Sequence, residues 1–178
     1  MKKLLVAIGV VAIAAISNAA SFSWSVAQVK QVTDTTQNAT GYLAVYMIGG
    51  TADLSSLQTK LLAGDYSTVD LTYSKTTSNG SANMSGQGNI ASGASQSGYV
   101  IIFDAGTLDD AQNFLVAQNS SGDQVLSRTV GTSGTAVSFA FGSQASNVAW
   151  QSMAVPEPTS GLLLVLGMAG LALRRRRA

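Results

Sequence analysis

Two apolar runs near the ends of this 178-residue chain bound the part that can fold as one body. The first run covers residues 4–16 and the second covers residues 161–173, and no other run in the chain is as long. We therefore predict three parts: an N-terminal segment at 1–19, a folded body at 20–154 and a tail at 155–178. A body of that size can bury enough surface to be stable without a disulfide or a metal ion.

The N-terminal segment has the order of a secretory signal peptide. Lys2 and Lys3 precede the apolar run, and a short polar exit with the small residues Ala19 and Ala20 follows it. A cationic start, an apolar run and a small-residue exit are typical of signals that the secretion translocon reads. We predict cleavage after Ala19, with Ala20 as the near alternative. A helix buried in the core is the competing interpretation of this segment.

The tail has three zones with different physical properties. In chain order they are Val155, Pro156, Glu157 and Pro158, then the second apolar run, then Arg174, Arg175, Arg176 and Arg177. Two prolines one residue apart keep the backbone extended and exposed, which suits a processing enzyme. As a helix the apolar run would span about 20 Å, short of the roughly 30 Å hydrocarbon core, and flanking residues would narrow that gap. Because the arginines favour a cytoplasmic end, we predict a transmembrane helix and an outward-facing body.

Taken together, the proline motif, the Gly- and Leu-rich run and the arginine cluster resemble a PEP-CTERM sorting signal. The resemblance implies recognition in the inner membrane by an exosortase, a cysteine transpeptidase-like membrane enzyme, and removal of the tail near Pro156, Glu157 and Pro158. It also implies delivery to the cell surface or to extracellular polysaccharide, with the inner membrane as a transient location. The competing interpretation is a permanent single-span anchor that is never cut.

Composition excludes several function classes for the body. The chain has no cysteine and no histidine, which removes disulfides, thiolate and imidazole catalysis, and Cys- or His-ligated metal sites. Six of the ten basic residues lie in the two terminal segments, so the body has four basic and eight acidic residues, and 4 minus 8 gives a net charge of −4. We therefore predict no nucleic-acid partner.

Apolar periodicity predicts a mainly β body with one short helix. Leu54, Leu57 and Leu61 recur at helical spacing within a predicted helix at 51–64, where Asp53 or Thr51 can cap the start and Gly64 suits the stop. Residues 77–97 are almost wholly small and polar, which predicts a long loop or a hairpin excursion. Period-2 alternation and short apolar runs predict strands at 21–32, 41–48, 69–76, 98–105, 114–117, 124–130, 136–141 and 147–153. The fold class we predict is an antiparallel sandwich or jelly-roll-like double sheet, with a barrel as the alternative.

Candidate metal ligands and catalytic groups are few. Asp104, Asp109, Asp110 and Asp123 could offer oxygen ligands to calcium, although a role as solvated turn residues is the favoured interpretation of these aspartates. Paired carboxylates could hydrolyse glycosides, but the body contains no glutamate. We predict no catalytic residues, no cofactor and no enzymatic activity.

Aromatic side chains and sequence motifs for glycosylation are the remaining candidates. The aromatic residues could form a sugar-stacking platform if several face solvent together, whereas packing in the core is the usual role. They are Phe22, Trp24, Tyr42, Tyr46, Tyr99, Phe103, Phe139, Phe141 and Trp150. The acceptor pattern for N-glycosylation begins at Asn38, Asn79, Asn83 and Asn119, and in a Ser- and Asn-rich chain such matches arise by chance.

The function that these observations favour is an exported, non-enzymatic structural or adhesive protein of the cell surface or extracellular matrix. Extracellular polysaccharide is the partner we expect for the body, besides the translocon and the exosortase-like enzyme that handle its ends. Two alternatives stay open at this point: a calcium-dependent carbohydrate-binding module and a small hydrolase that uses aspartates.

Overall fold

A computed structural model describes residues 20–131, 135–142 and 149–154 of the chain. In these ranges the protein is mainly β, with two sheets and one α-helix. In chain order the elements are β1 (Ala20–Val26), β2 (Leu43–Ile48), α1 (Thr51–Leu62), the 3-10 helix η1 (Leu71–Tyr73), β3 (Ser74–Thr76), β4 (Ala82–Ile90), β5 (Ser95–Phe103), β6 (Asn113–Val116), β7 (Leu126–Thr129), β8 (Val137–Phe141) and β9 (Gln151–Ser152). The predicted fold class is confirmed at this level.

The larger sheet is organised around the long strand β5. Its strand order is β3-β2-β5-β6-β9, and β7 pairs with the first half of β5. On one side, β2 pairs antiparallel with β5 from Gly98 to Phe103. On the other side, β7 pairs with Ser95–Gly98 and β6 pairs with Ile101–Phe103, so two short strands share one edge of β5.

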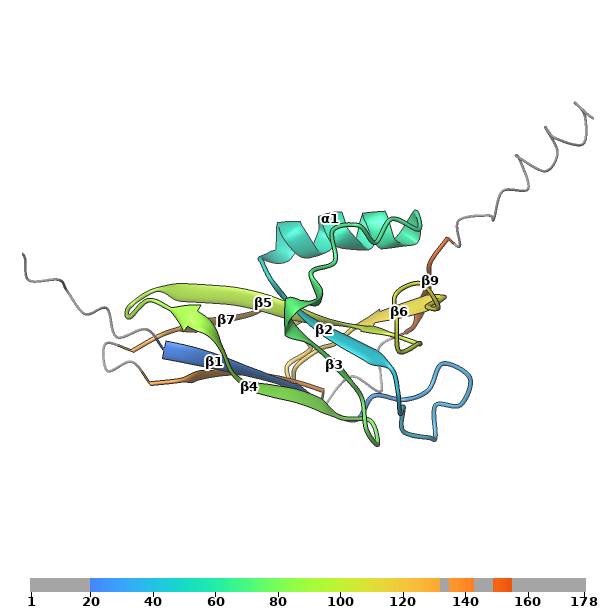
Figure 1. Ribbon diagram of the computed structural model, residues 1–178, viewed down its shortest axis with the longest axis horizontal. Helices are drawn as coiled ribbons and strands as arrows, with labels where there is room; N and C mark the ends of the chain where they lie inside the picture. The colour runs from blue at the N-terminus through green and yellow to red at the C-terminus, as the bar shows by residue number, and fades with distance from the viewer. Residues whose placement is uncertain (1–19, 132–134, 143–148, 155–178) are drawn as a thin grey trace, which may run out of the picture.

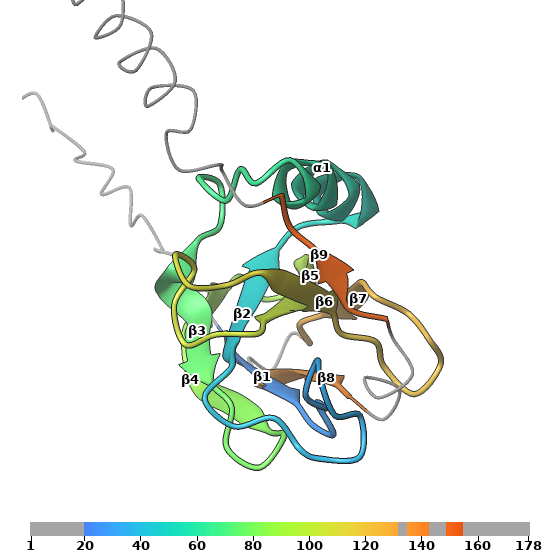
Figure 2. The same cartoon turned by 90° about the vertical axis from the view of Figure 1, so that its right-hand side faces the viewer.

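The smaller sheet has the order β4-β1-β8, with the N-terminal strand in the middle. β1 pairs antiparallel with β4 and parallel with β8, where Phe22 lies opposite Val137. The smaller sheet is therefore mixed, and the purely antiparallel arrangement that we predicted is wrong here. Figure 2 shows three layers: α1, then the larger sheet, then the smaller sheet. Figure 1 shows that β1 and β9 lie toward opposite ends of the long axis.

Both faces of the larger sheet are buried, which explains why β5 is apolar without alternation. Tyr99, Ile101 and Phe103 face α1, whereas Val100 and Ile102 face the smaller sheet. The sequence of a strand that is covered on both faces is a nearly continuous run of apolar residues. The strand that the sequence predicts at 98–105 is therefore confirmed, and it begins earlier, at Ser95.

Aromatic rings fill the space between the two sheets. Tyr46 of the larger sheet lies with its ring centroid 5.1 Å from that of Phe22 and 5.3 Å from that of Phe139, both in the smaller sheet. Its ring also stacks on Trp24 at 6.4 Å. Gly98 of β5 lies beneath this tyrosine, where no side chain would fit. Packing of this kind contributes ring–ring attraction in addition to the burial of apolar area.

The amphipathic helix α1 covers the outer face of the larger sheet. Leu54, Leu57 and Leu61 are buried against it, as their spacing predicts, and Leu62 is exposed. At the start, the Gly50 N–H donates to Asp53 Oδ2 at 2.7 Å, so Asp53 caps the helix from a position in its first turn.

The last helical residue of α1 is Leu62, and Gly64, two residues later, terminates the helix as predicted. This glycine has a φ of +77°, and its N–H donates to the Leu61 carbonyl at 3.0 Å, while the Asp65 N–H donates to the Lys60 carbonyl at 2.9 Å. Paired hydrogen bonds of this kind, around a residue in the left-handed region, satisfy carbonyls that the helix leaves free.

Of the two interpretations of residues 77–97, a long loop or a hairpin excursion, the long loop is wrong. Residues 82–90 form β4, the edge strand of the smaller sheet, and Ser95 already belongs to β5. β4 has few residues with high strand propensity, and it forms because β1 offers it a partner and buries its end residues Ala82 and Ile90. Local composition predicts the loop, and tertiary pairing overrides it.

Two predicted strands are shorter than their apolar patterns indicate. The strand predicted at 21–32 ends at Val26, because Gln28 has a φ of +61° and turns the chain so that the Val29 N–H donates to the Gly80 carbonyl at 3.0 Å. In the strand predicted at 69–76, only β3 is extended. The Asp70 carboxylate accepts from the Thr72 N–H at 2.9 Å and caps η1, so the residues just before β3 form a 3-10 helix and not a strand.

The remaining short strands are confirmed in part as β6, β7, β8 and β9. Of the strand predicted at 147–153, only Gln151–Ser152 is extended, and residues 147 and 148 lie outside the described residues. The predicted hydrophobic helices at the two termini also lie outside them. Within 20–131, 135–142 and 149–154, no helix is long and apolar enough to cross a bilayer.

Candidate functional site

The described part of the body reaches Ala154, the residue immediately before the predicted sorting motif. Met153 is buried between the larger sheet and α1, and its N–H donates to the Gln112 carbonyl at 2.8 Å. The Ala154 N–H then donates to the Leu62 carbonyl at the end of α1, at 3.3 Å. The motif begins at Val155 in the sequence, so no linker separates it from the last ordered contact. The motif and the four arginines of the tail themselves lie outside the described residues.

At the other end, the predicted signal-cleavage junction adjoins the first strand. Ala20 is the first residue of β1, is 1% exposed, and lies opposite Ile90 of β4. Cleavage after Ala19 would leave β1 complete, whereas cleavage after Ala20 would remove its first residue. Ala19 lies outside the described residues, so the junction stays a prediction.

Asp104 holds the loop between β5 and β6. Its Oδ1 accepts from the backbone N–H groups of Gln112 at 2.8 Å and Asn113 at 2.9 Å, and its Oδ2 accepts from Asn113 Nδ2 at 2.7 Å. Three donors to one carboxylate pin both ends of the loop together. This arrangement gives Asp104 a structural role that the sequence did not reveal.

The other three candidate metal ligands do not join Asp104. Asp110 accepts from the Thr107 hydroxyl at 2.7 Å, and Asp109 is exposed in the same loop. Asp123 belongs to the loop between β6 and β7, where Asn119 Nδ2 donates to its Oδ2 at 2.9 Å. Among the described residues, no three acidic side chains converge as they would around a metal ion.

Most of the candidate aromatic residues are in the core. Seven of the nine are at most 4% exposed; these are Phe22, Trp24, Tyr46, Tyr99, Phe103, Phe139 and Phe141. Tyr42 and Trp150 are half-buried and meet edge to face, with their ring centroids 5.6 Å apart. A platform of several solvent-facing rings is therefore not formed by these nine residues, and a single pair remains.

Burial raises the pKa values of two tyrosines, and hydrogen bonds in local turns lower the pKa values of three aspartates. Burial raises the pKa of Tyr46 to about 12, against a hydrogen bond that Gln96 donates at 3.2 Å. Burial, and then the charge of Asp53, raise the pKa of Tyr99. Each of three aspartates accepts from a hydroxyl and a backbone N–H two residues later, which lowers its pKa; the three are Asp34, Asp65 and Asp70.

The four candidate glycosylation sites differ in how their amides are used. Asn38 Nδ2 donates to Asn79 Oδ1 at 2.9 Å, so two of these asparagines bind each other. The Asn119 side chain organises its own loop. Asn83 is exposed on β4, and no hydrogen bond of its side chain is found among the described residues. Modification of Asn83 would therefore break no side-chain hydrogen bond found among the described residues.

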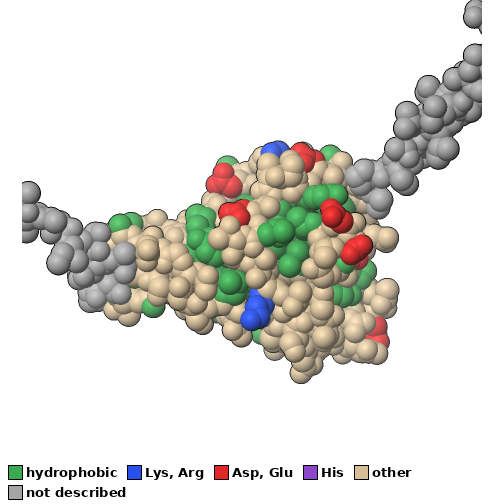
Figure 3. All heavy atoms as spheres, in the orientation of Figure 1, with side chains coloured by type: hydrophobic (Ala, Val, Ile, Leu, Met, Phe, Trp, Pro, Cys, Tyr) green, Lys and Arg blue, Asp and Glu red, His purple; other side chains and the backbone are tan. Residues whose placement is uncertain are grey.

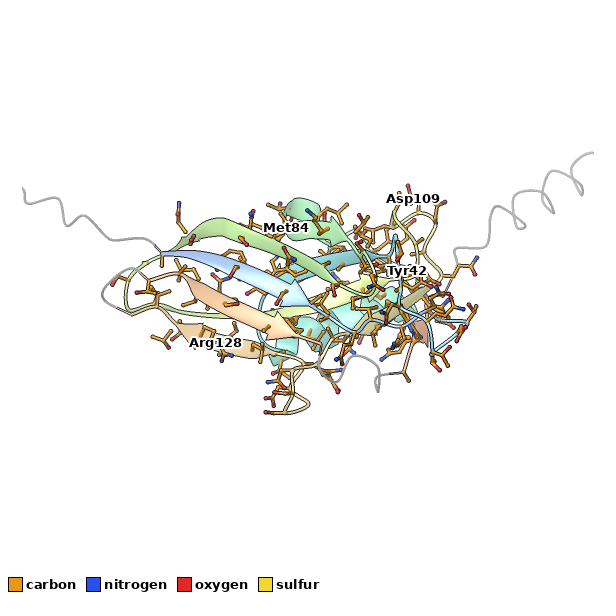
Figure 4. The ribbon with its side chains drawn as sticks, turned by 90° about the horizontal axis from the view of Figure 1, so that it is seen from below. Tyr42, Met84, Asp109 and Arg128 are labelled. Carbon is orange, nitrogen blue, oxygen red and sulfur yellow. The ribbon has the colours of Figure 1, made fainter. Side chains whose placement is uncertain are left out.

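Small polar side chains cover the outer face of the smaller sheet. Because Phe22 and Trp24 point inward, Ser23 and Ser25 of β1 point outward, where they lie opposite Ser138 and Ala140 of β8. Figure 4 views the molecule from this side, with Met84 on the edge strand β4 and Arg128 on β7. The face therefore presents short, uncharged groups along β1.

Two hollows flank α1, and sequence analysis did not find them. The first has a volume of about 220 Å³ and is lined by Met47, Ile48, Asp53, Ser56, Leu57, Lys60, Thr68 and Tyr99. The second has a volume of about 320 Å³ and is lined by Thr51, Leu54, Gln118, Gly122, Asp123, Gln124 and Val125. Figure 3 shows the face that includes α1, where hydrophobic side chains gather beneath the helix and charged side chains are scattered. Each hollow joins segments far apart in the chain, and no local pattern marks it.

Comparison with known proteins identifies the tail. Residues 154–177 match the family model of the PEP-CTERM protein-sorting motif, which confirms the resemblance seen in the sequence. No curated protein and no solved structure gives a significant match to the chain. The match supports export, processing by exosortase, and a location at the cell surface or outside the cell.

Proposed function

We propose that this protein is a structural or adhesive component of the cell surface or extracellular matrix, and that its body acts by binding rather than by catalysis. The match of residues 154–177 to the PEP-CTERM protein-sorting motif carries the proposal. In this account residues 1–19 are a secretion signal, removed at Ala19. The tail then holds the chain in the inner membrane until exosortase cuts near Pro156.

The junction between body and tail supports processing after folding. Met153 and Ala154 contact the larger sheet and the end of α1, so the folded body extends to the residue before the motif. A cut within the motif would therefore remove the tail and leave both hydrophobic cores unchanged.

The composition of the body supports a binding role. It contains no histidine, cysteine or glutamate, and three of its four candidate carboxylates, those of Asp104, Asp110 and Asp123, accept hydrogen bonds within local turns and loops. These observations favour neither a hydrolase nor a calcium-dependent module. Short, uncharged side chains along β1 suit contact with a neutral polymer better than with a charged one.

The test is the intact mass of the protein recovered from its native cell surface. It is compared with that of a variant in which Pro156, Glu157 and Pro158 are alanines. We expect the native protein to begin at Ala20 and to end near the motif, and the variant to keep its tail and to stay in the membrane fraction. If both proteins keep residues 161–178, the tail is a permanent anchor and the processing part of the proposal is wrong.

A further inference from the structure

The larger hollow beside α1 has the construction of a small binding site. It lies between the N-terminal half of α1 and the loop that joins β6 to β7, and its volume is about 320 Å³. That volume is at the lower end of the range for small-molecule sites, roughly 300 to 1,000 Å³. One ring-sized molecule, or one unit of a polymer, would fill it.

The loop that forms one wall is held in shape by Asn119. Its Oδ1 accepts from the N–H groups of Ser121 and Asp123, both at 2.8 Å, and its N–H donates to the Asp123 carbonyl at 3.0 Å. Its Nδ2 also donates to Asp123 Oδ2 at 2.9 Å. A loop fixed in this way loses little conformational entropy when a ligand binds.

Two carboxamides in this wall have no side-chain hydrogen-bond partner among the described residues. Gln118 and Gln124 are half-buried, and neither side chain makes a hydrogen bond with any described residue. Each offers two N–H donors and one acceptor oxygen, and a half-buried amide is costly to leave unpaired. Thr51 adds a hydroxyl across the hollow, and Asp123 adds a carboxylate.

The lining selects a class of ligand. No lysine or arginine lines the hollow, and its one charged lining side chain is the Asp123 carboxylate, which would repel an anion. One carboxylate is too few for a metal site built from protein oxygens. Leu54 and Val125 supply a small apolar surface between the polar groups. A molecule with several hydroxyl groups and an apolar C–H face fits this pattern of donors, acceptors and apolar floor.

From this lining we propose that the hollow binds one neutral sugar unit, free or within a polysaccharide, through Gln118, Gln124, Thr51 and Asp123. The proposal names a ligand class for the proposed surface role and rests on that role for its biological setting. It does not depend on processing of the tail, because every lining residue belongs to the folded body.

The experiment follows the side-chain amide signals of the full chain in detergent by NMR during titration. The probes are D-glucose, D-galactose and the neutral trisaccharide cellotriose, with D-glucuronate as the anionic comparison. We expect saturable shifts of the Gln118 and Gln124 amide signals with at least one neutral probe, and weaker binding of glucuronate. Because a neutral hydrogen bond contributes about 0.5–1.5 kcal/mol, Gln118→Ala and Gln124→Ala should each weaken binding about three- to tenfold.

The matched control is Gln58→Ala, which removes a carboxamide from α1 that lines neither hollow. It should leave affinity unchanged, and backbone spectra should show that every variant is folded. The proposal is overturned if no neutral probe gives a saturable shift up to 100-millimolar concentrations. It is also overturned if glucuronate binds as tightly, or if Gln58→Ala weakens binding as much as Gln124→Ala. A failed mass test of the tail would leave these readouts unchanged, so the two proposals fail separately.

Discussion

Replacing Gly98 with alanine should destabilise the body by about 2 kcal/mol, because the new methyl group collides with Tyr46. A Cβ built on Gly98 would lie 2.1 Å from Tyr46 Oη, 2.3 Å from Cζ and 2.7 Å from Cε2. Ordinary carbon contacts are about 3.5–4.0 Å, so the ring would have to move by more than about 1 Å.

The surroundings of Tyr46 make that movement costly. The residue is 1% exposed, and its ring lies 5.1 Å from Phe22 and 5.3 Å from Phe139. Overpacking of a core costs about 1–3 kcal/mol, and losing the hydrogen bond from Gln96 costs about 1 kcal/mol more. Alanine recovers about 0.5–1 kcal/mol through the lower backbone entropy of the unfolded chain, which leaves a net loss of about 2 kcal/mol.

Urea unfolding of residues 20–154, followed by tryptophan fluorescence, measures the change in the free energy of unfolding. The same substitution is then made in two backgrounds. Tyr46→Phe removes only Oη, so the cost of Gly98→Ala should persist. Tyr46→Leu removes the ring, and the cost should fall below about 0.5 kcal/mol. The reasoning fails if Gly98→Ala is nearly neutral in the native background, or equally costly after Tyr46→Leu.

Three further predictions concern titration and loop structure. Because Tyr46 ionises near pH 10 when unfolded and at about 12 when folded, its contribution to stability should be complete below pH 10 and fall as the pH rises toward 12. Tyr46→Phe should flatten that fall in alkaline urea titrations. The lowered pKa values of Asp34, Asp65 and Asp70 give contributions that are present above their usual value of 3.8 and lost as the pH falls below it. Urea midpoints at pH 5 and pH 2.5 should therefore differ less once all three are asparagine. Asp104→Ala should cost about 2 kcal/mol in thermal or urea unfolding, and Asp104→Asn, which keeps one acceptor oxygen, about half as much; equal costs would contradict the assigned hydrogen bonds.

Elements whose structure is determined by residues close together in the chain were predicted from the sequence. The helix at 51–64 and the buried strand at 98–105 are confirmed because leucine spacing and a doubly covered apolar run leave a clear pattern. The sorting motif was also recognised from adjacent residues, and the family match confirms it. Each of these features is encoded within a short window of sequence.

Features that depend on distant partners were missed. β4 contains Gly86 and Gly88 at positive φ, and its register with β1 shifts twice, so neither propensity nor alternation marks it as a strand. The hollow that includes Thr51 and Gln124 exists only because the β6–β7 loop lies beside α1. Core packing was the expected role for most of the aromatic residues and is confirmed, whereas the particular ring–ring contacts depend on how the two sheets pack.

The central position of β1 in the smaller sheet determines when that sheet can be completed during folding. Its partners are β4 and β8, and Phe22 lies opposite Val137, close to the end of the body. During amino-terminus-first translocation, the first strand to emerge has to wait, unpaired on one side, until nearly the whole body has crossed. Pairing between strands so far apart in the chain is slow, so the smaller sheet should not close while the chain is still crossing the membrane. Completion of the sheet and arrival of the sorting tail at the membrane would then nearly coincide.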